Sequence, residues 1–126
     1  RVGDVLAQYN FIVVVPEVLR DTALQVRQSA FALIGDCAKH CIQYLQPFLN
    51  DILPLCAKSL RENTSATVSN NASWATGEIC VKVSPEVMAP HLDEVCAALV
   101  GVLARPKWQQ GQQQLLMQNA CITLGR

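Results

Sequence analysis

The sequence lacks a charge imbalance, a long apolar run and any familiar cofactor motif. Its ten basic and ten acidic side chains give a formal net charge of zero at pH 7. A nucleic-acid-binding protein needs clustered Lys and Arg to displace counterions, so this composition argues against direct nucleic-acid binding. No stretch approaches the ~18 uncharged apolar residues of a membrane-spanning helix, so we expect no membrane span. The chain also lacks a Gly-rich phosphate loop and paired catalytic carboxylates.

The cysteines lack the spacing of a metal site or a redox motif. No two of them form a C-x-x-C pair, and no signal peptide precedes them. Most occupy apolar-periodic positions, where a free cysteine acts as a small apolar side chain. We therefore expect a reducing compartment, cytosol or nucleus, and no disulfides. The six are Cys37, Cys41, Cys56, Cys80, Cys96 and Cys121.

Two chemical alternatives centre on these cysteines. Cys37, His40 and Cys41 share one side of a helix and could ligate a metal, but a structural zinc site needs four ligands and no fourth is nearby. A Cys nucleophile assisted by His40 or His91 would be an enzyme, yet the cysteines follow the periodicity of a helix core. We predict no metal, no cofactor and no enzymatic activity.

What the sequence does contain is apolar character and internal repetition. Hydrophobic residues make up 51% of the 126 residues, enough for one small folded domain. The chain begins at Arg1 without a methionine and ends at Arg126 inside a helical pattern. We interpret it as part of something longer.

Three segments, 26–36, 68–78 and 116–126, align without gaps. Each has an aliphatic residue, an Ala four residues later and a Gly five residues after that. A second pair of segments, 47–60 and 90–103, aligns at an offset of 43 residues. Two alternating helix types with a period in the forties indicate an all-α solenoid of helical pairs. We expect three repeats, at about 4–43, 46–84 and 88–126, the last of them truncated.

The apolar residues of two of these segments follow the period of a helix rather than the alternation of a strand. The predicted core stripes are Val26, Ala30, Leu33, Cys37 and Cys41, and Val68, Ala72, Ala75, Ile79 and Val83.

Prolines and polar runs mark the expected ends and bends of helices. Pro47 and Pro90 suit a first helical turn, whereas Pro16 and Pro54 predict kinks. The run Phe11–Val15 could pass for a strand, but its place before the helix at Val26 favours an outer helix. The glutamine-rich run Gln109–Gln114 is expected to be a solvated loop.

The segment from Val13 to Asp21, followed by Val26-Arg27, Ala30, Leu33 and Gly35, resembles a HEAT repeat. A second resemblance, carried by the block Asn70-Asn-Ala-Ser-Trp74-Ala-Thr-Gly-Glu78, points to a more specific family. With 26–36 and 119–126, this block is similar to the C-terminal half of the transportins, karyopherin-β receptors that import cargo bearing proline-tyrosine nuclear localisation signals. The resemblance runs from about residue 10 to residue 126.

This resemblance implies a site and a set of partners. In the family, second helices line a concave surface that holds the cargo signal in extended form, and its contact residues fall on Trp74, Asn70, Asn119 and Ile122. One further contact position is Ala66 here, which makes that pocket wall shallower. The implied partners are signal-bearing cargo, nucleoporins, and Ran GTPase through repeats outside this chain. The implied location is cytoplasm and nucleus.

The residues themselves also single out Trp74. At 100° per residue, Asn70, Trp74 and Glu78 lie roughly opposite the core stripe of Val68. An indole off the stripe is a good anchor for a peptide, and Asn70 could bond a peptide backbone. Asp36 and Glu78, which end aligned blocks, are possible contacts for basic residues of a signal.

Plainer interpretations stand beside these. Trp74 could be core between repeats, and the acids could be merely solvated. Trp108 is expected to anchor a loop, His91 needs no function, and Arg27 is expected to bond a neighbouring repeat. The alternative for the whole chain is a structural HEAT scaffold, or another karyopherin with different cargo. Solvent exposure of Asn70 and Trp74 would separate a receptor from a scaffold.

Overall fold

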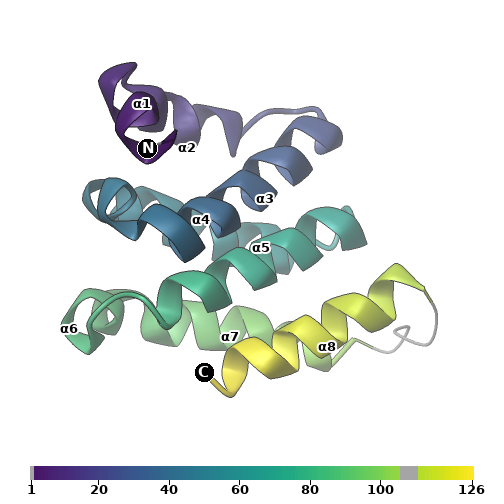
Figure 1. Cartoon of the computed structure of the whole chain (residues 1–126). Helices are drawn as coiled ribbons and strands as arrows, with labels where there is room; N and C mark the ends of the chain where they lie inside the picture. The colour runs from purple at the N-terminus through teal and green to yellow at the C-terminus, as the bar shows by residue number, and fades with distance from the viewer. Residues whose placement is uncertain (1, 106–110) are drawn as a thin grey trace.

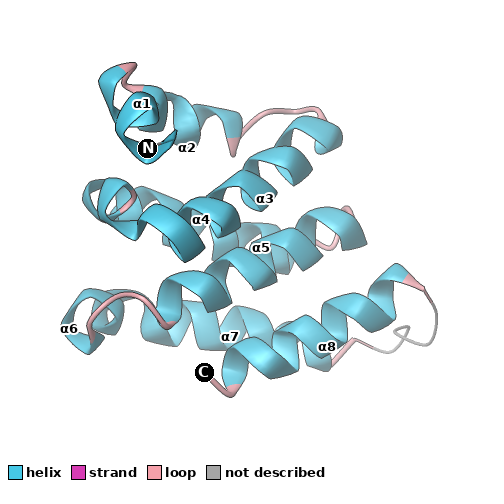
Figure 2. Cartoon of the chain, in the orientation of Figure 1, coloured by secondary structure: helices cyan, strands magenta, loops and turns pink. Residues whose placement is uncertain are grey.

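The computed structural model describes residues 2–105 and 111–126, and helices dominate both ranges (Figure 2). No strand occurs within these two ranges, which confirms the all-α prediction. In chain order the elements are α1 (Val2–Gln8), η1 (Phe11–Val14), α2 (Val15–Val18), α3 (Leu24–Cys41), η2 (Ile42–Tyr44), η3 (Gln46–Phe48), α4 (Leu49–Glu62), α5 (Ala66–Cys80), α6 (Pro85–Met88), η4 (Ala89–His91), α7 (Leu92–Leu103) and α8 (Gln112–Leu124), where η denotes a 3-10 helix.

The long helices form two layers. Helices α3, α5 and α8 lie side by side in one row, which we call the front layer, and α4 and α7 lie behind it as the back layer (Figure 1). Helix α5 occupies the middle of the front layer and packs against α3 on one side and α8 on the other. Short helices α1 and α2 cover the amino-terminal end of the stack (Figure 1).

The hydrophobic core runs through the stack and draws on both layers. Phe31 and Ile34 of α3 and Ile79 of α5 are fully buried, as are several large apolar residues of the back layer. The back-layer residues include Leu49, Ile52, Leu53 and Leu60 of α4 and Leu99 of α7. Burial of this kind, rather than helix propensity alone, stabilises helices of 12 to 18 residues.

The prolines shape the back layer in a repeated way. Pro47 and Pro90 each lie in a 3-10 turn that leads directly into α4 or α7, so each stands just before the α-helix rather than in its first turn. Helix α4 continues through Pro54 to Glu62. At the amino-terminal end, the segment 11–18 is helical, as predicted, with Pro16 in the first turn of α2.

The two predicted core stripes have different outcomes. Val68, Ala72, Ala75 and Ile79 of α5 are all buried, as predicted, whereas Val83, which follows the end of α5, is only partly buried. In the α3 stripe, Ala30 and Cys37 are buried, but Val26 and Leu33 are 38% and 37% exposed. That part of the prediction is wrong because α3 is the first helix of the front layer.

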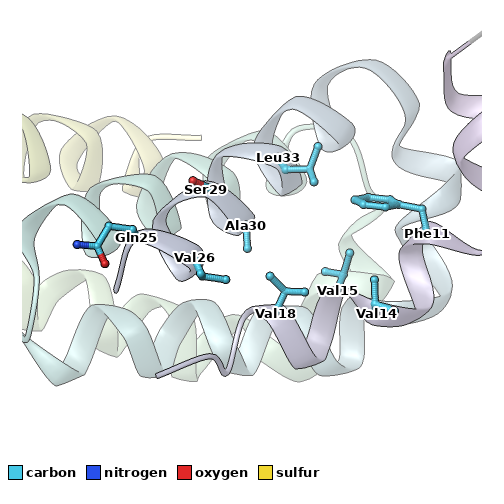
Figure 3. A pocket seen from close by; sticks show the side chains of 9 residues that line it. All are labelled: Phe11, Val14, Val15, Val18, Gln25, Val26, Ser29, Ala30 and Leu33. Carbon is cyan, nitrogen blue, oxygen red and sulfur yellow. The ribbon is translucent and has the colours of Figure 1, made fainter. Parts of the chain in front are cut away.

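On its outer side α3 faces short helices instead of a long one, and between it, η1 and α2 lies an apolar groove of about 440 Å³. Val26 and Leu33 line this groove opposite Phe11 and Val18 (Figure 3).

The prediction for the glutamine-rich run is also wrong where it can be checked. Gln112, Gln113 and Gln114 form the first turn of α8 rather than a loop, although all three are exposed as expected. Gln is a good helix former, and the buried side chain of Leu116, which follows, anchors the start of the helix to the core. Gln109 and Gln110, and Trp108, lie outside the described residues.

Candidate functional site

Trp74 lies near the centre of the front layer. It belongs to α5, and its indole packs directly over Gly35 of the neighbouring helix α3. A Cβ atom at residue 35 would lie only 2.1 to 2.7 Å from three ring carbons of Trp74, so no residue other than glycine leaves room for the ring in this position. The ring therefore bridges two consecutive front-layer helices.

The indole is nevertheless accessible. Trp74 as a whole is half-buried, not buried. Its ring N–H has no hydrogen-bond partner within the described residues and is not among the buried unpartnered side-chain atoms. An aromatic ring with one face packed on protein and a free N–H donor can accept an apolar group and donate one hydrogen bond to a ligand.

Two asparagines join the front-layer helices at equivalent positions. The Nδ2 of Asn71 on α5 donates to the backbone oxygen of Gln28 on α3, at 2.9 Å. The Nδ2 of Asn119 on α8 donates to the Oδ1 of Asn70 on α5, also at 2.9 Å. In the sequence repeat, Asn71 aligns with Asn119 and Gln28 aligns with Asn70. The chain thus joins neighbouring front-layer helices from equivalent asparagines, once to a backbone oxygen and once to a side-chain oxygen, and holds Asn70 beside Asn119.

The remaining residues implied by the family resemblance lie on the same layer. Ile122 of α8, which aligns with Trp74 in the repeat, is 53% exposed. Ala66 is half-buried in the first turn of α5, directly after Ser65, whose side-chain oxygen caps the helix by accepting from the N–H of Val68 at 3.3 Å. The front layer therefore carries an exposed apolar side chain, Ile122, on the helix next to that of the half-buried indole.

The two candidate acids differ in their surroundings. Asp36 is exposed on α3. Glu78 is buried, and its Oε1 accepts a hydrogen bond from Nη1 of Arg126 at 2.8 Å, in an ion pair that joins α5 to α8. Asp36 is thus open to a ligand, whereas Glu78 is held within the protein.

The structure adds residues that the sequence pattern did not single out. Gly35 and Arg126 determine the surroundings of Trp74 and Glu78, and Asn71 forms one of the two asparagine joints. For Gly35 there was a signal: it is the conserved glycine of the three aligned blocks within this chain, at 35, 77 and 125. Asn71 lies in the block that resembles the transportins, but no pattern indicated its bond to α3 or the ion pair of Arg126.

Residues weighed for other roles have structural partners. Arg27 pairs with Glu62 of α4 at 3.0 Å, as predicted for a bond to a neighbouring repeat. His91 is buried against Asn50 of α4, with 2.9 Å between Nε2 and Oδ1. These contacts join helices, and the histidine ring is engaged in one of them.

The buried thiols of Cys37 and Cys56 are poorly suited to nucleophilic chemistry. All six cysteines are free, and burial raises the pKa of the Cys56 thiol to about 12. Burial also raises the pKa of Cys37, and the neighbouring Cys41 adds to that effect. Across residues 2–105 and 111–126, no three His, Cys, Asp or Glu side chains gather where they could hold a metal ion.

None of the helices in the described ranges is both long and apolar enough to cross a membrane.

Comparison with known proteins places the chain by similarity. Transportin-1 of Mus musculus and of Homo sapiens are each 34% identical to it over 126 residues, which is 100% of this chain but 13% of theirs. Transportin-1 of Oryza sativa subsp. japonica is 39% identical over 109 residues, 84% of the chain and 12% of the relative. Importin subunit beta-2 of Schizosaccharomyces pombe is 30% identical over 111 residues, 85% of the chain and 11% of that relative.

No family model matches the chain. The chain spans only 13% of the length of the mouse and human relatives, but that match covers every residue of it. On this similarity, and with an all-helical stack of paired layers, the chain belongs to the transportin group of the karyopherin-β family and corresponds to a segment of its members.

Proposed function

We propose that the front layer binds an extended nuclear localisation signal of the proline-tyrosine type, as part of a nuclear import receptor. The observation that carries the proposal is the position of the Trp74 indole, which packs on Gly35, is only partly buried and has no partner for its N–H among the residues that the structure describes. Asn70, Asn119 and Ile122 act with it as the main contacts. The names of the relatives, which denote transport and import, support the same reading.

Each contact has a defined role in this proposal. An apolar side chain of the signal packs between the indole of Trp74 and the exposed side chain of Ile122. The amides of Asn70 and Asn119 bond the main chain of the peptide, because an extended peptide offers unpaired N–H and C=O groups along its length. The small Ala66 leaves a shallow wall at the amino-terminal end of α5.

The two acids, Asp36 and Glu78, contribute unequally to the binding of basic residues of the signal. Asp36 is exposed and can pair with a Lys or Arg of the signal. Glu78 reaches a basic residue only if its ion pair with Arg126 opens, so we assign it a secondary role. Pairs of this kind at an exposed surface contribute about 0 to 1 kcal/mol and weaken with salt, so they tune rather than determine affinity.

The cellular role follows from that of the family. We propose that the protein of which this chain forms part shuttles between cytoplasm and nucleus and contacts nucleoporins. It releases its cargo when Ran GTPase binds at repeats outside these residues. Comparing cargo capture with and without GTP-bound Ran tests this part of the proposal. Capture that is indifferent to Ran would argue against it.

A structural HEAT scaffold is the second candidate. It is favoured by the close packing of the indole on Gly35, which makes Trp74 part of a joint between consecutive helices. In a scaffold the ring would serve only to join the two helices, and its accessible part would bind no peptide.

Replacing Trp74 by alanine separates the two. As a receptor, the Trp74→Ala protein loses about 2 kcal/mol of binding free energy, about 30-fold in Kd, for a fluorescein-labelled proline-tyrosine signal peptide measured by fluorescence anisotropy. The control is Leu92→Ala, which removes a 50% exposed apolar side chain from the back layer and leaves affinity unchanged. If Trp74→Ala binds as tightly as Leu92→Ala while remaining folded, the scaffold interpretation holds.

A further inference from the structure

A small cleft lies within the first two turns of the three front-layer helices. Its volume is about 130 Å³, and it is lined by Gln28 of α3, by Thr67, Asn70 and Asn71 of α5, and by Gln112 and Leu115 of α8. Four of these six residues carry a carboxamide, and none is charged. The lining therefore combines hydrogen-bond donors and acceptors with no net charge.

The asparagine joints leave defined groups free in this cleft. Because Asn71 uses its Nδ2 to bond Gln28, its Oδ1 remains as an acceptor. Because Asn70 uses its Oδ1 to accept from Asn119, its Nδ2 remains as a donor. The side-chain amides of Gln28 and Gln112 also have no partner within the described residues, and none of these atoms is buried. An acceptor and a donor thus lie side by side on α5.

We propose that this cleft binds a primary carboxamide side chain, Gln or Asn, of the peptide that contacts Trp74. The inference rests on the proposed function and adds a second specificity element to it. A carboxamide presents an acceptor and a donor group, which complement the Oδ1 of Asn71, the amides of Gln28 and Gln112, and one of the two N–H groups of Asn70, whose other N–H stays available to the peptide main chain. A volume of about 130 Å³ corresponds to roughly four waters at ~30 Å³ each, close to the four or five heavy atoms of these side chains.

Other ligand groups fit less well. A charged side chain would be transferred from water to a cleft that offers no opposite charge, which is costly. An aliphatic side chain of similar size would leave the amides of the cleft without partners once water is displaced. The chemistry of the lining therefore selects a neutral polar side chain.

The position of the cleft sets a spacing in the peptide. Asn70 and Trp74 are four residues apart on α5, about 6 Å along the helix axis. In an extended peptide, side chains on the same face are two residues apart, about 6.6 Å. The carboxamide residue is therefore expected two positions from the apolar residue that contacts the indole.

The test uses fluorescein-labelled proline-tyrosine signal peptides in two sets of three. The tested position, which holds Gln, Leu or Glu, lies two residues before the apolar residue in one set and two residues after it in the other. Fluorescence anisotropy against the unchanged protein should give a Kd for the Gln peptide about fivefold lower than for the Leu and Glu peptides, in one direction only. Equal affinity for all three peptides in both directions overturns the inference.

A set of variants locates the effect. In the double variant Gln28→Leu with Gln112→Leu, the preference for Gln over Leu falls to within about twofold, because two amides of the cleft are gone. The control Gln113→Leu changes an exposed glutamine on α8 that does not line the cleft, and the preference persists. A preference that survives the double variant places carboxamide recognition elsewhere and overturns the inference.

Trp74→Ala separates this inference from the proposed function. If this variant binds all three peptides more weakly but the unchanged protein shows no preference for Gln, Trp74 is a peptide contact and the cleft does not bind a carboxamide. If it weakens none of them, the peptide site itself is wrong, and the inference fails with it.

Discussion

At the scale of single residues, the contact between Gly35 and Trp74 determines how the indole is presented. The glycine allows the ring to lie against the backbone of α3, which holds one side of it on protein. A larger residue at 35 would displace the ring towards solvent. The exposure of the anchor is therefore controlled by a residue on a different helix.

Replacing Gly35 by alanine tests this control. The new Cβ would lie within 2.1 to 2.7 Å of ring carbons of Trp74, so the ring must move, and we expect the free energy of unfolding to fall by about 1 to 3 kcal/mol. Urea unfolding followed by circular dichroism measures the loss, and a shift in tryptophan emission reports movement of the ring.

The matched control is Gly101→Ala on α7, where a Cβ meets nothing within 4 Å. This change should stabilise the protein by about 0.5 to 1 kcal/mol, because alanine is the better helix former. If both glycine variants have the same stability, the ring does not depend on Gly35.

The cysteines supply a second prediction at this scale. With its pKa raised to about 12 by burial, Cys56 stays protonated at pH 8 and should react with a thiol reagent only as the protein unfolds. Cys121 is exposed and should react within the first fast phase. Mass spectrometry of the protein labelled at pH 8 identifies the modified residues, and rapid labelling of Cys56 would contradict its burial.

At the scale of the helices, α5 depends on a capped amino terminus. Ser65 accepts a hydrogen bond from the N–H of Val68, so Ser65→Ala should lower the free energy of unfolding by about 1 kcal/mol. Thermal or urea unfolding measures the change. Thr64→Ala, at the exposed neighbouring residue, is the control and should have almost no effect; equal losses in both would show that the cap contributes nothing.

Most helices could be predicted from the sequence because their apolar residues repeat with helical period and their blocks align. The stripe of Val68 is buried as expected, since α5 has a front-layer helix on either side. The stripe of Val26 is partly exposed because periodicity shows which face is apolar but not whether another helix covers it. The prediction of a loop at Gln112–Gln114 was wrong for a related reason, since exposed glutamines are equally compatible with a helix and a loop.

The candidate site was only partly visible in the sequence. Trp74 and Asn70 stood out because they depart from the core stripe of their own helix. The hydrogen bond from Asn119 to Asn70 and the contact with Gly35 join residues 49 and 39 positions apart, and no local pattern encodes such pairings. The ion pair of Glu78 with Arg126 was hidden for the same reason.

At the scale of the whole molecule, stability should be greatest at the middle of the stack. Ile79→Ala removes a fully buried side chain from the central helix and should cost about 2 to 5 kcal/mol. Leu33→Ala removes a side chain that is 37% exposed at the amino-terminal edge and should cost clearly less. Urea denaturation of both variants tests this gradient, and equal losses would contradict it.

The polar contacts between neighbouring helices differ in the two layers, and this determines how each layer responds to ionic strength. Helices α4 and α7 are bridged by Arg61 and Glu94, whose side chains are 49% and 40% exposed, so salt screens that attraction. The asparagine joints of the front layer carry no net charge and do not titrate. Raising ionic strength should therefore weaken the Arg61–Glu94 pair, by at most about 1 kcal/mol, and affect the less exposed Glu78–Arg126 pair between α5 and α8 less. The two asparagine joints do not depend on salt, so the register of α3, α5 and α8 is fixed at a row of amides.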